Sequence, residues 1–168
     1  MVETNGRNFD LLTLGQVLLR LSPPDNERLS RGDTFVKQVG GAELNVAVGA
    51  ALLGLHTGVI SKLPAHDIGS FMKGKIRSFG VSDDFFMYDQ SSAARVGIYY
   101  YENGAYPRKP KVIYDRNHSS FFSLDIDEIP EEVYTASKCF HTTGITLALN
   151  GDIRETTIEM IKRFKAAG

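Results

Sequence analysis

The sequence has little that would place it in a membrane, on nucleic acid or in an oxidising compartment. Cys139 is its one cysteine, so an internal disulfide is excluded, and its apolar surroundings predict a small buried side chain. The formal net charge of −1 gives no attraction to nucleic acid or to an anionic membrane. No apolar run has the length of a spanning helix, and Glu3, Arg7 and Asp10 place charges where a signal peptide would be apolar. We therefore expect a cytoplasmic protein.

The 168 residues are enough for one domain with a core of ordinary size. Apolar runs alternate with segments of helical periodicity, which is typical of βαβ units and a parallel sheet. The expected strands are residues 9–21 with a break at Gly15, 34–39, 58–63, 96–101, 111–114 and 138–145, and the expected helices are residues 44–55, 68–79 and 153–164. Gly168 stands where a helix C-cap glycine belongs. Since a crossover helix leads into a parallel strand, the sequence predicts a chain truncated at this point.

Two adjacent glycines, Gly40 and Gly41, join the expected strand 34–39 to the expected helix 44–55. Without Cβ atoms they can adopt positive φ and leave backbone N–H groups open to a ligand, and the helix start adds unpaired donors. Taken alone, the segment is equally consistent with an ordinary tight connection. The helix is almost free of charge, so we expect it to be buried on most sides. Asn45 in its first turn either satisfies the backbone or faces a pocket.

The expected strands 96–101 and 111–114 are rich in tyrosine, and Asn103-Gly104 between them favours a tight hairpin turn. Two prolines in the connection indicate instead a longer loop and a position at a sheet edge. The arginines near this hairpin are Arg95, Arg108 and Arg116. An exposed hairpin whose tyrosines cover apolar surface is one interpretation. Recognition of a polyhydroxylated acid is the other, because tyrosine hydroxyls and an arginine fork suit such a ligand.

Three further motifs predict no nucleotide or metal site. Residues 69–76 fall one residue short of a phosphate-binding loop, because Ile76 stands where a serine or threonine is required and no strand precedes the segment. The acidic run 125–132 fits no calcium-loop register, so we interpret it as a solvated helix N-terminus. His141 has no zinc-like spacing to the other three histidines and is expected to be a hydrogen-bonded core residue.

Taken together, the motifs resemble the ribokinase-like (PfkB) carbohydrate kinases, and within them the 2-keto-3-deoxygluconate kinase branch. The residues that carry the resemblance are Gly15, Gly40-Gly41 with Asn45, Arg95-Val96-Gly97-Ile98-Tyr99, Val112-Ile113-Tyr114-Asp115-Arg116 and Thr143-Gly144-Ile145-Thr146. The resemblance implies a three-layer α/β/α fold with a parallel sheet and a small β-sheet lid made by residues near 18–22, 34–39, 96–101 and 111–115. Gln16 departs from the family, which has a carboxylate there. Asp115 stands where some relatives have an aromatic residue.

The resemblance also implies a set of substrate-binding residues, which are Gly40, Gly41, Asn45, Tyr99, Tyr114 and Arg116. Gly41 and Asn45 would hold sugar hydroxyls, and Tyr99 would form a wall of the pocket. Arg116 with Tyr114 would bind the carboxylate of a sugar acid, because a guanidinium can form two parallel hydrogen bonds to it. The family often dimerises through its lid, so a homodimer is implied as well.

The implied function is ATP-dependent phosphorylation of a sugar acid, 2-keto-3-deoxygluconate. Family members are about twice as long, so residues 1–168 would be the N-terminal part of such a domain. The catalytic aspartate and most residues that bind ATP and Mg²⁺ would lie outside this chain, which alone should be inactive. Two alternatives stay open: a neutral-sugar kinase of the same family, such as a fructokinase, ribokinase or nucleoside kinase, and a non-catalytic sugar-binding or dimerising fragment. A dinucleotide-binding fold is disfavoured because the first βα turn lacks Gly-x-Gly-x-x-Gly.

Overall fold

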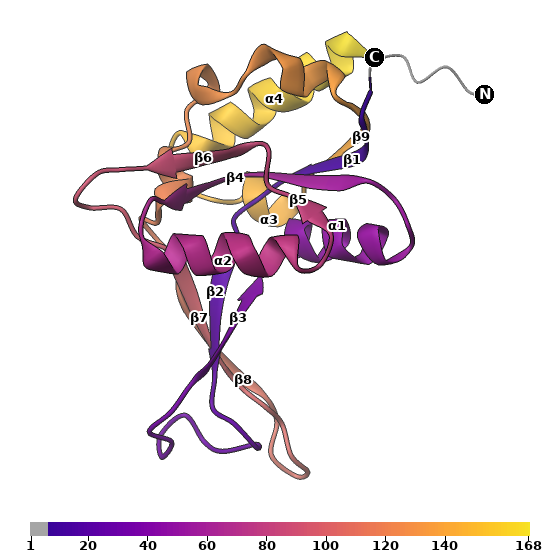
Figure 1. The fold of residues 1–168 in the computed structure, drawn as a ribbon. Coiled ribbons are helices and arrows are strands. Elements are labelled where there is room, and N and C mark those ends of the chain that lie inside the picture. The colour runs from indigo at the N-terminus through magenta and orange to yellow at the C-terminus, as the bar shows by residue number, and fades with distance from the viewer. Residues whose placement is uncertain (1–6) are drawn as a thin grey trace.

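A parallel sheet lies at the centre of the structure, a computed structural model that describes residues 7–168 (Figure 1). Glu3 lies outside the described residues. The strands of this sheet are β1 (Phe9–Leu14), β4 (Thr57–Pro64), β5 (Val81–Ser82), β6 (Phe86–Asp89) and β9 (Ser137–His141). β1 pairs with β4 on one side and β9 on the other, and β4 pairs with β5 near its start and β6 near its end. All these pairs are parallel, as the alternation of strands and helices predicts.

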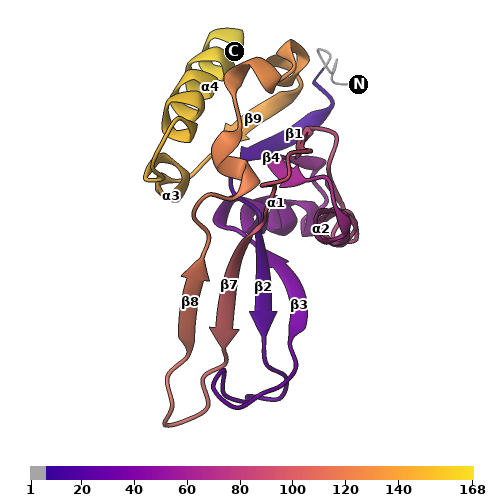
Figure 2. The same ribbon diagram turned by 90° about the vertical axis from the view of Figure 1, so that its left-hand side faces the viewer.

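Helices cover both faces of the sheet, which confirms the predicted three-layer α/β/α fold (Figure 2). On one face lie α1 (Ala42–Leu52) and α2 (Asp67–Arg77), and on the other lies α4 (Ile153–Ala167). The second face is also covered by the short helices η1 (Ser120–Ser123), η2 (Ile126–Glu128) and η3 (Glu131–Thr135). Each face has its own apolar core: Met72 of α2 and Met160 of α4 are both fully buried, in separate clusters. Burial on both faces explains why the central strands are continuously apolar.

The motif at residues 69–76 lies inside α2 and is not a phosphate-binding loop. His66 caps this helix, its Nδ1 accepting a hydrogen bond of 3.2 Å from the N–H of Ile68. Gly69 packs directly against the carbonyl of Pro64, where a Cβ atom would collide. The glycine therefore serves the close packing of α2 on the end of β4.

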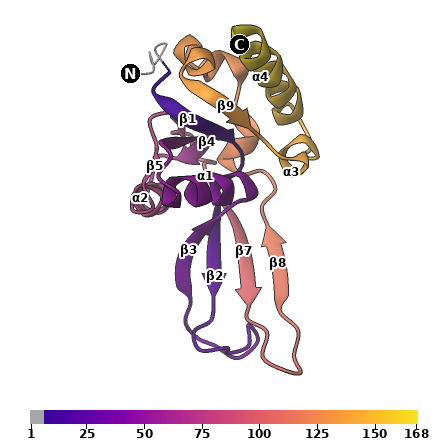
Figure 3. The same cartoon turned by 90° about the vertical axis from the view of Figure 1, so that its right-hand side faces the viewer.

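A second sheet, here called the lid, projects from one end of the central sheet (Figures 1 and 3). Its strand order is β3 (Val36–Gly40), β2 (Leu18–Ser22), β7 (Gly97–Glu102) and β8 (Lys111–Asp115), close to the ranges expected. β2 and β7 run parallel, whereas the two outer pairs are antiparallel. Residues 103–110 connect β7 to β8, so Asn103-Gly104 does not form a two-residue turn. β8 is an edge strand, as the prolines indicate, but β7 lies inside the lid.

Helix α1 is less buried than its uncharged sequence predicts. It packs on β1 and β4 through Leu44 and Ala47, whose side chains are buried. Leu52 and Leu53 at its end are 77% and 84% exposed. The prediction of burial on most sides is therefore wrong for the described residues. A lack of charge shows that a face can be buried, but no element within residues 7–168 covers the outer side of this helix.

Strand β9 is an edge strand of the sheet formed by residues 7–168, which corrects two predictions. Cys139 is exposed, not buried, and the neighbouring Lys138 reaches back to form a 2.7 Å ion pair with Asp10 of β1. His141 is half-buried, and its Nε2 has no hydrogen-bond partner among the described residues, contrary to the predicted satisfied core histidine. The exposure of Cys139 follows from the edge position, because an apolar strand is buried only where neighbours lie on both sides of it, whereas the buried Nε2 of His141 has no such explanation.

The acidic run lies at the starts of the two short helices η2 and η3, as the predicted solvated helix N-terminus requires. Asp125 and Glu128 form a reciprocal capping box around η2, and Glu128 also pairs with Lys62 of β4 at 2.6 Å. These carboxylates are therefore engaged in local structure.

Gly168 follows α4, and its φ of +89° fits the predicted C-cap. Within residues 7–168, no helix combines the length and the apolar character that crossing a membrane requires.

Candidate functional site

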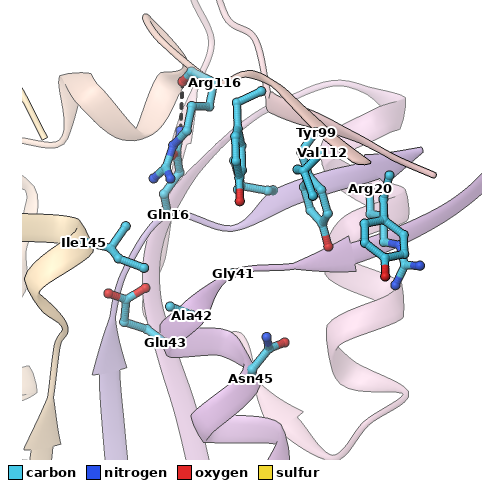
Figure 4. Close-up of a pocket in the computed structure, with 13 residues that line it drawn as sticks. Gln16, Arg20, Gly41, Ala42, Glu43, Asn45, Tyr99, Val112, Arg116 and Ile145 are labelled. Atoms are coloured by element: carbon cyan, nitrogen blue, oxygen red, sulfur yellow. Dashed lines mark hydrogen bonds between the residues drawn. The ribbon is translucent and has the colours of Figure 1, made fainter. Parts of the chain in front are cut away.

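A pocket of about 320 Å³ lies between the lid and the start of α1 (Figure 4). It brings together five of the six residues expected to bind substrate: Gly41, Asn45, Tyr99, Tyr114 and Arg116. They come from segments up to 75 residues apart in sequence, and the fold places them around one cavity. The sixth residue, Gly40, is buried behind the pocket, where a Cβ atom would collide with the hydroxyl of Tyr99. Gly40 thus gives room to a lining residue.

Gly41 is the N-cap residue of α1 and has a backbone conformation that only glycine adopts freely. Its φ is +147° and its ψ is 141°, and a Cβ atom would lie 2.6 Å from the carbonyl oxygen of Gln16. No side chain among the described residues caps this helix, so its first N–H groups stay open for other acceptors. Asn45, one turn later, is exposed toward the same cavity. The turn therefore brings backbone and amide donors to the pocket.

Gln16 fixes the position of Arg116, a role that the sequence did not reveal. The Nε of Arg116 donates a 2.7 Å hydrogen bond to Oε1 of Gln16. The Nε2 of Gln16 in turn donates to the carbonyl of Arg116 at 3.0 Å and to Oγ of Ser119 at 2.7 Å. Gln16 is only 3% exposed. The buried amide thus holds both the backbone and the side chain of Arg116 and leaves the two terminal nitrogens of its guanidinium available.

The other two arginines of the hairpin are engaged outside the pocket. Arg95 forms a 2.9 Å ion pair with Asp115, and Arg108 forms one of 3.3 Å with Glu102. Of the three, Arg116 lines the cavity. Burial lowers the pKa of Arg116, whereas the negative charge of Glu43 and the nearby Tyr114 raise it. Because the usual pKa of arginine is far above neutrality, the guanidinium stays charged and can bind an anion.

The lid contributes an aromatic wall. The rings of Tyr99 and Tyr114 lie 5.9 Å apart, and the guanidinium of Arg20 lies 4.3 Å above the ring of Tyr101. Burial raises the pKa of Tyr99, so its hydroxyl remains protonated and can donate a hydrogen bond. Arg20 and Tyr101 were not predicted from the sequence as lining residues. The two-residue period of a strand could have found them, because Arg20 follows Leu18 and Tyr101 follows Tyr99 on the same face.

Glu43 is a further residue that was not predicted from the sequence. It is 2% exposed, and its Oε1 accepts hydrogen bonds from the N–H of Thr143 at 3.2 Å, from the hydroxyl of Thr143 and from the hydroxyl of Thr146 at 2.8 Å. These bonds join α1 to the short helix α3 (Gly144–Leu147). Gly15 approaches the Glu43 side chain so closely that a Cβ atom would collide with it.

Among residues 7–168, no three His, Cys, Asp or Glu side chains are grouped so that they could hold a metal ion. The polar groups around the pocket are instead two amides, several phenols, guanidinium groups and a carboxylate held by threonines. These groups bind hydroxyl and carboxylate oxygens. The fold and the pocket therefore define an α/β protein with a polar pocket beneath a β lid.

Comparison with known proteins identifies the family to which the chain belongs. The model of the pfkB family carbohydrate kinases matches residues 8–168, and the chain belongs to that family. It is 37% identical over 159 residues to a 2-dehydro-3-deoxygalactonokinase from Haloferax volcanii, covering 95% of this chain and 49% of that protein. It is 30% identical over 149 residues to 5-dehydro-2-deoxygluconokinase 1 from Bacillus cereus, covering 88% of this chain and 44% of that protein.

A solved structure agrees with the sequence comparison. The crystal structure of 2-dehydro-3-deoxygluconokinase from Thermotoga maritima matches with a TM-score of 0.88 and 34% identity, covering 94% of this chain and 48% of that one. The ribokinase-like fold and the likeness to the 2-keto-3-deoxygluconate kinase branch are thereby confirmed. The chain spans about half the length of the curated relatives it matches.

Proposed function

We propose that this chain forms the sugar-acid-binding half of an ATP-dependent kinase for 2-keto-3-deoxygluconate, which is also called 2-dehydro-3-deoxygluconate. The observation that supports this most is Arg116, a charged guanidinium held at the pocket by Gln16 with its terminal nitrogens available. A carboxylate is the ligand group that best complements such a fork. The three relatives described above are all named as kinases of dehydro-deoxy sugar acids, which supports the same substrate class.

In this proposal each lining residue has a defined task. Arg116 with Tyr114 binds the carboxylate, while Asn45 and the backbone at Gly41 bind hydroxyls. Tyr99 closes the pocket from the lid side and excludes water. Together these contacts fix the sugar so that one hydroxyl is presented to the phosphoryl donor, which is how a kinase lowers its barrier by positioning.

The phosphoryl donor that we propose is ATP with Mg²⁺, as in carbohydrate kinases generally. The described residues do not fit a site for ATP and Mg²⁺. Residues 69–76 are helical, and no acidic cluster suited to a metal occurs within residues 7–168. We therefore place the nucleotide site and the catalytic base on residues outside this chain. A chain in which residues 1–168 are continued by such a nucleotide-binding half is called the complete kinase below.

A substrate panel tests the proposal. The complete kinase should phosphorylate 2-keto-3-deoxygluconate with a higher kcat/KM than fructose or ribose, and calorimetry should show binding of the sugar acid without nucleotide. Preference for fructose or ribose would favour a neutral-sugar kinase instead. Failure to phosphorylate any sugar would favour a non-catalytic binding or dimerising module. Phosphorylation by residues 1–168 alone would show that the proposed division between two halves is wrong.

Gln16 provides a test of how Arg116 is held. Gln16→Leu keeps the volume of the side chain but removes its hydrogen bonds to Arg116 and Ser119. In the complete kinase we expect KM for 2-keto-3-deoxygluconate to rise about 5- to 10-fold, since a net contribution of about 1 kcal/mol is typical of one hydrogen bond. In a background of Arg116→Ala the same change should have little further effect on KM. Additive losses would show that Gln16 acts independently of Arg116.

The lid also presents a surface suited to a second copy of the chain, and we propose that the protein is a homodimer through it. On the face that carries Leu18 and Arg20, its outer strands β3 and β8 expose Val36 at 47% and Val112 at 42%. Apolar side chains on edge strands favour association, and lysine at such positions opposes it. Sedimentation of the protein should give the mass of a dimer, and Val36→Lys with Val112→Lys should shift it to a monomer. An unchanged dimer in that variant would exclude the lid as the interface.

A further inference from the structure

The two carboxylate oxygens of Glu43 have very different surroundings. Oε1 accepts three hydrogen bonds, two from Thr143 and one from Thr146. Oε2 accepts none from the residues that the structure describes, although 98% of the residue's surface is buried, leaving 2% exposed. Glu43 nevertheless lines the pocket, and Figure 4 shows its carboxylate directed toward the space bounded by Gln16, Gly41 and Ile145. An acceptor that has no donor among the described residues therefore faces the cavity.

We infer that Glu43 is a substrate-binding residue whose Oε2 accepts a hydrogen bond from a hydroxyl of the sugar acid. The inference rests on the proposed function, because it assigns a contact to the same substrate. Three donors already satisfy Oε1, whereas Oε2 keeps its capacity to accept a hydrogen bond from a group in the pocket. The hydroxyl-rich chain of a sugar acid supplies such a donor.

The charge of Glu43 also determines which way round the ligand lies. A carboxylate of the ligand would be repelled by Oε2 and attracted by Arg116, which lines the same pocket. A hydroxyl, in contrast, can donate to Oε2. Glu43 and Arg116 together therefore select a hydroxy acid in one orientation, with its carboxylate on the guanidinium and a neutral hydroxyl on the glutamate. A ligand that carried a second carboxylate at the hydroxyl position would be rejected.

A structural role alone would also explain the burial of Glu43, because its bonds join α1 to α3. Glu43→Gln separates the two roles. The amide oxygen can replace Oε1 and accept from Thr143 and Thr146, whereas the amide nitrogen replaces Oε2 and can no longer accept. Thr146→Val is the matched control, since it removes one bond to Oε1 and leaves Oε2 unchanged.

The test is calorimetric binding of 2-keto-3-deoxygluconate to the complete kinase without nucleotide. We expect Glu43→Gln to raise Kd about 10-fold with little change in melting temperature, and Thr146→Val to lower the melting temperature with little change in Kd. Sugar acids lacking one hydroxyl at a time then identify the contact. One such analogue should bind the wild type about 10-fold more weakly than the parent, and this difference should disappear in Glu43→Gln.

The outcomes separate this inference from the proposed function. If the wild type binds the sugar acid but Glu43→Gln binds it equally well, the assignment of Glu43 is wrong and the proposed function stands. If Glu43→Gln weakens binding of every analogue by the same factor as the parent, Glu43 acts only through the structure, and the assignment is again wrong. If the wild type binds no sugar acid, both proposals fail.

Discussion

Replacing Arg116 with alanine in the complete kinase should raise KM for 2-keto-3-deoxygluconate about 10- to 150-fold. A hydrogen bond to a charged group contributes about 1.5 to 3 kcal/mol, and 1.4 kcal/mol corresponds to a factor of ten. The carboxylate does not react, so its contact is present equally in the ground state and the transition state, and kcat should change less than KM. Arg116→Lys should recover only part of the loss, because an ammonium group cannot form two parallel hydrogen bonds.

Arg95→Ala is the matched control for this variant. Arg95 lies close to Arg116 in the fold but pairs with Asp115 at 2.9 Å, and the two side chains are 40% and 54% exposed. An exposed pair of this kind contributes about 0 to 1 kcal/mol to stability, and its loss should leave KM unchanged. Fructose and ribose give the second control. An equal loss with these neutral sugars in Arg116→Ala would mean that Arg116 supports the pocket and does not recognise a carboxylate.

The comparison of these arginines shows what the sequence could and could not predict. Sequence pattern placed Arg95, Arg108 and Arg116 near one tyrosine-rich hairpin, and the resemblance singled out Arg116. The pattern could not show that Asp115 and Glu102 engage the other two, because those pairs depend on strand register across the lid. Register follows from which face of a strand is buried, and the exposed strand β8 gives a weak signal of it.

Gln16 and Glu43 were missed for a different reason. Each contacts residues about 100 positions away, namely Arg116 for Gln16 and Thr143 for Glu43. Local periodicity predicts strands and helices well, since it depends on neighbours within a few residues. A buried polar contact between distant segments produces no periodic pattern in the local sequence. The departure at Gln16 was visible in the sequence, but only the fold shows that its amide binds the backbone and the side chain of Arg116.

The predictions that Cys139 and most of α1 are buried were wrong because they rested on local sequence alone. Both lie in apolar sequence, and apolar sequence was expected to be buried. In a parallel sheet, however, burial of a strand depends on both neighbouring strands and on both covering layers. β9 has β1 on one side, and among residues 7–168 no strand lies on its other side. The sequence pattern thus predicted the main strands and helices but not the place of each in the sheet, and it missed β5, β6 and α3.

Gly41→Ala should lower the stability of the protein by about 2 to 3 kcal/mol and weaken sugar-acid binding at the same time. The backbone at φ +147° costs a residue with a Cβ atom about 1 to 3 kcal/mol, and the added atom would lie 2.6 Å from the carbonyl oxygen of Gln16. For a chain of this size the melting temperature should fall by roughly 5 to 10 °C. Relief of the contact moves Gln16, and Arg116 moves with it, so KM should also rise.

Gly49→Ala, in the interior of the same helix, is the control that separates backbone strain from a general intolerance of alanine. A Cβ atom there meets nothing within 4 Å, and the residue is exposed. Alanine should therefore stabilise the helix by about 0.5 to 1 kcal/mol, with no change in KM. Thermal unfolding and KM measured on both variants test the link directly. A stable Gly41→Ala variant with normal KM would show that this turn neither requires glycine nor positions Arg116 through Gln16.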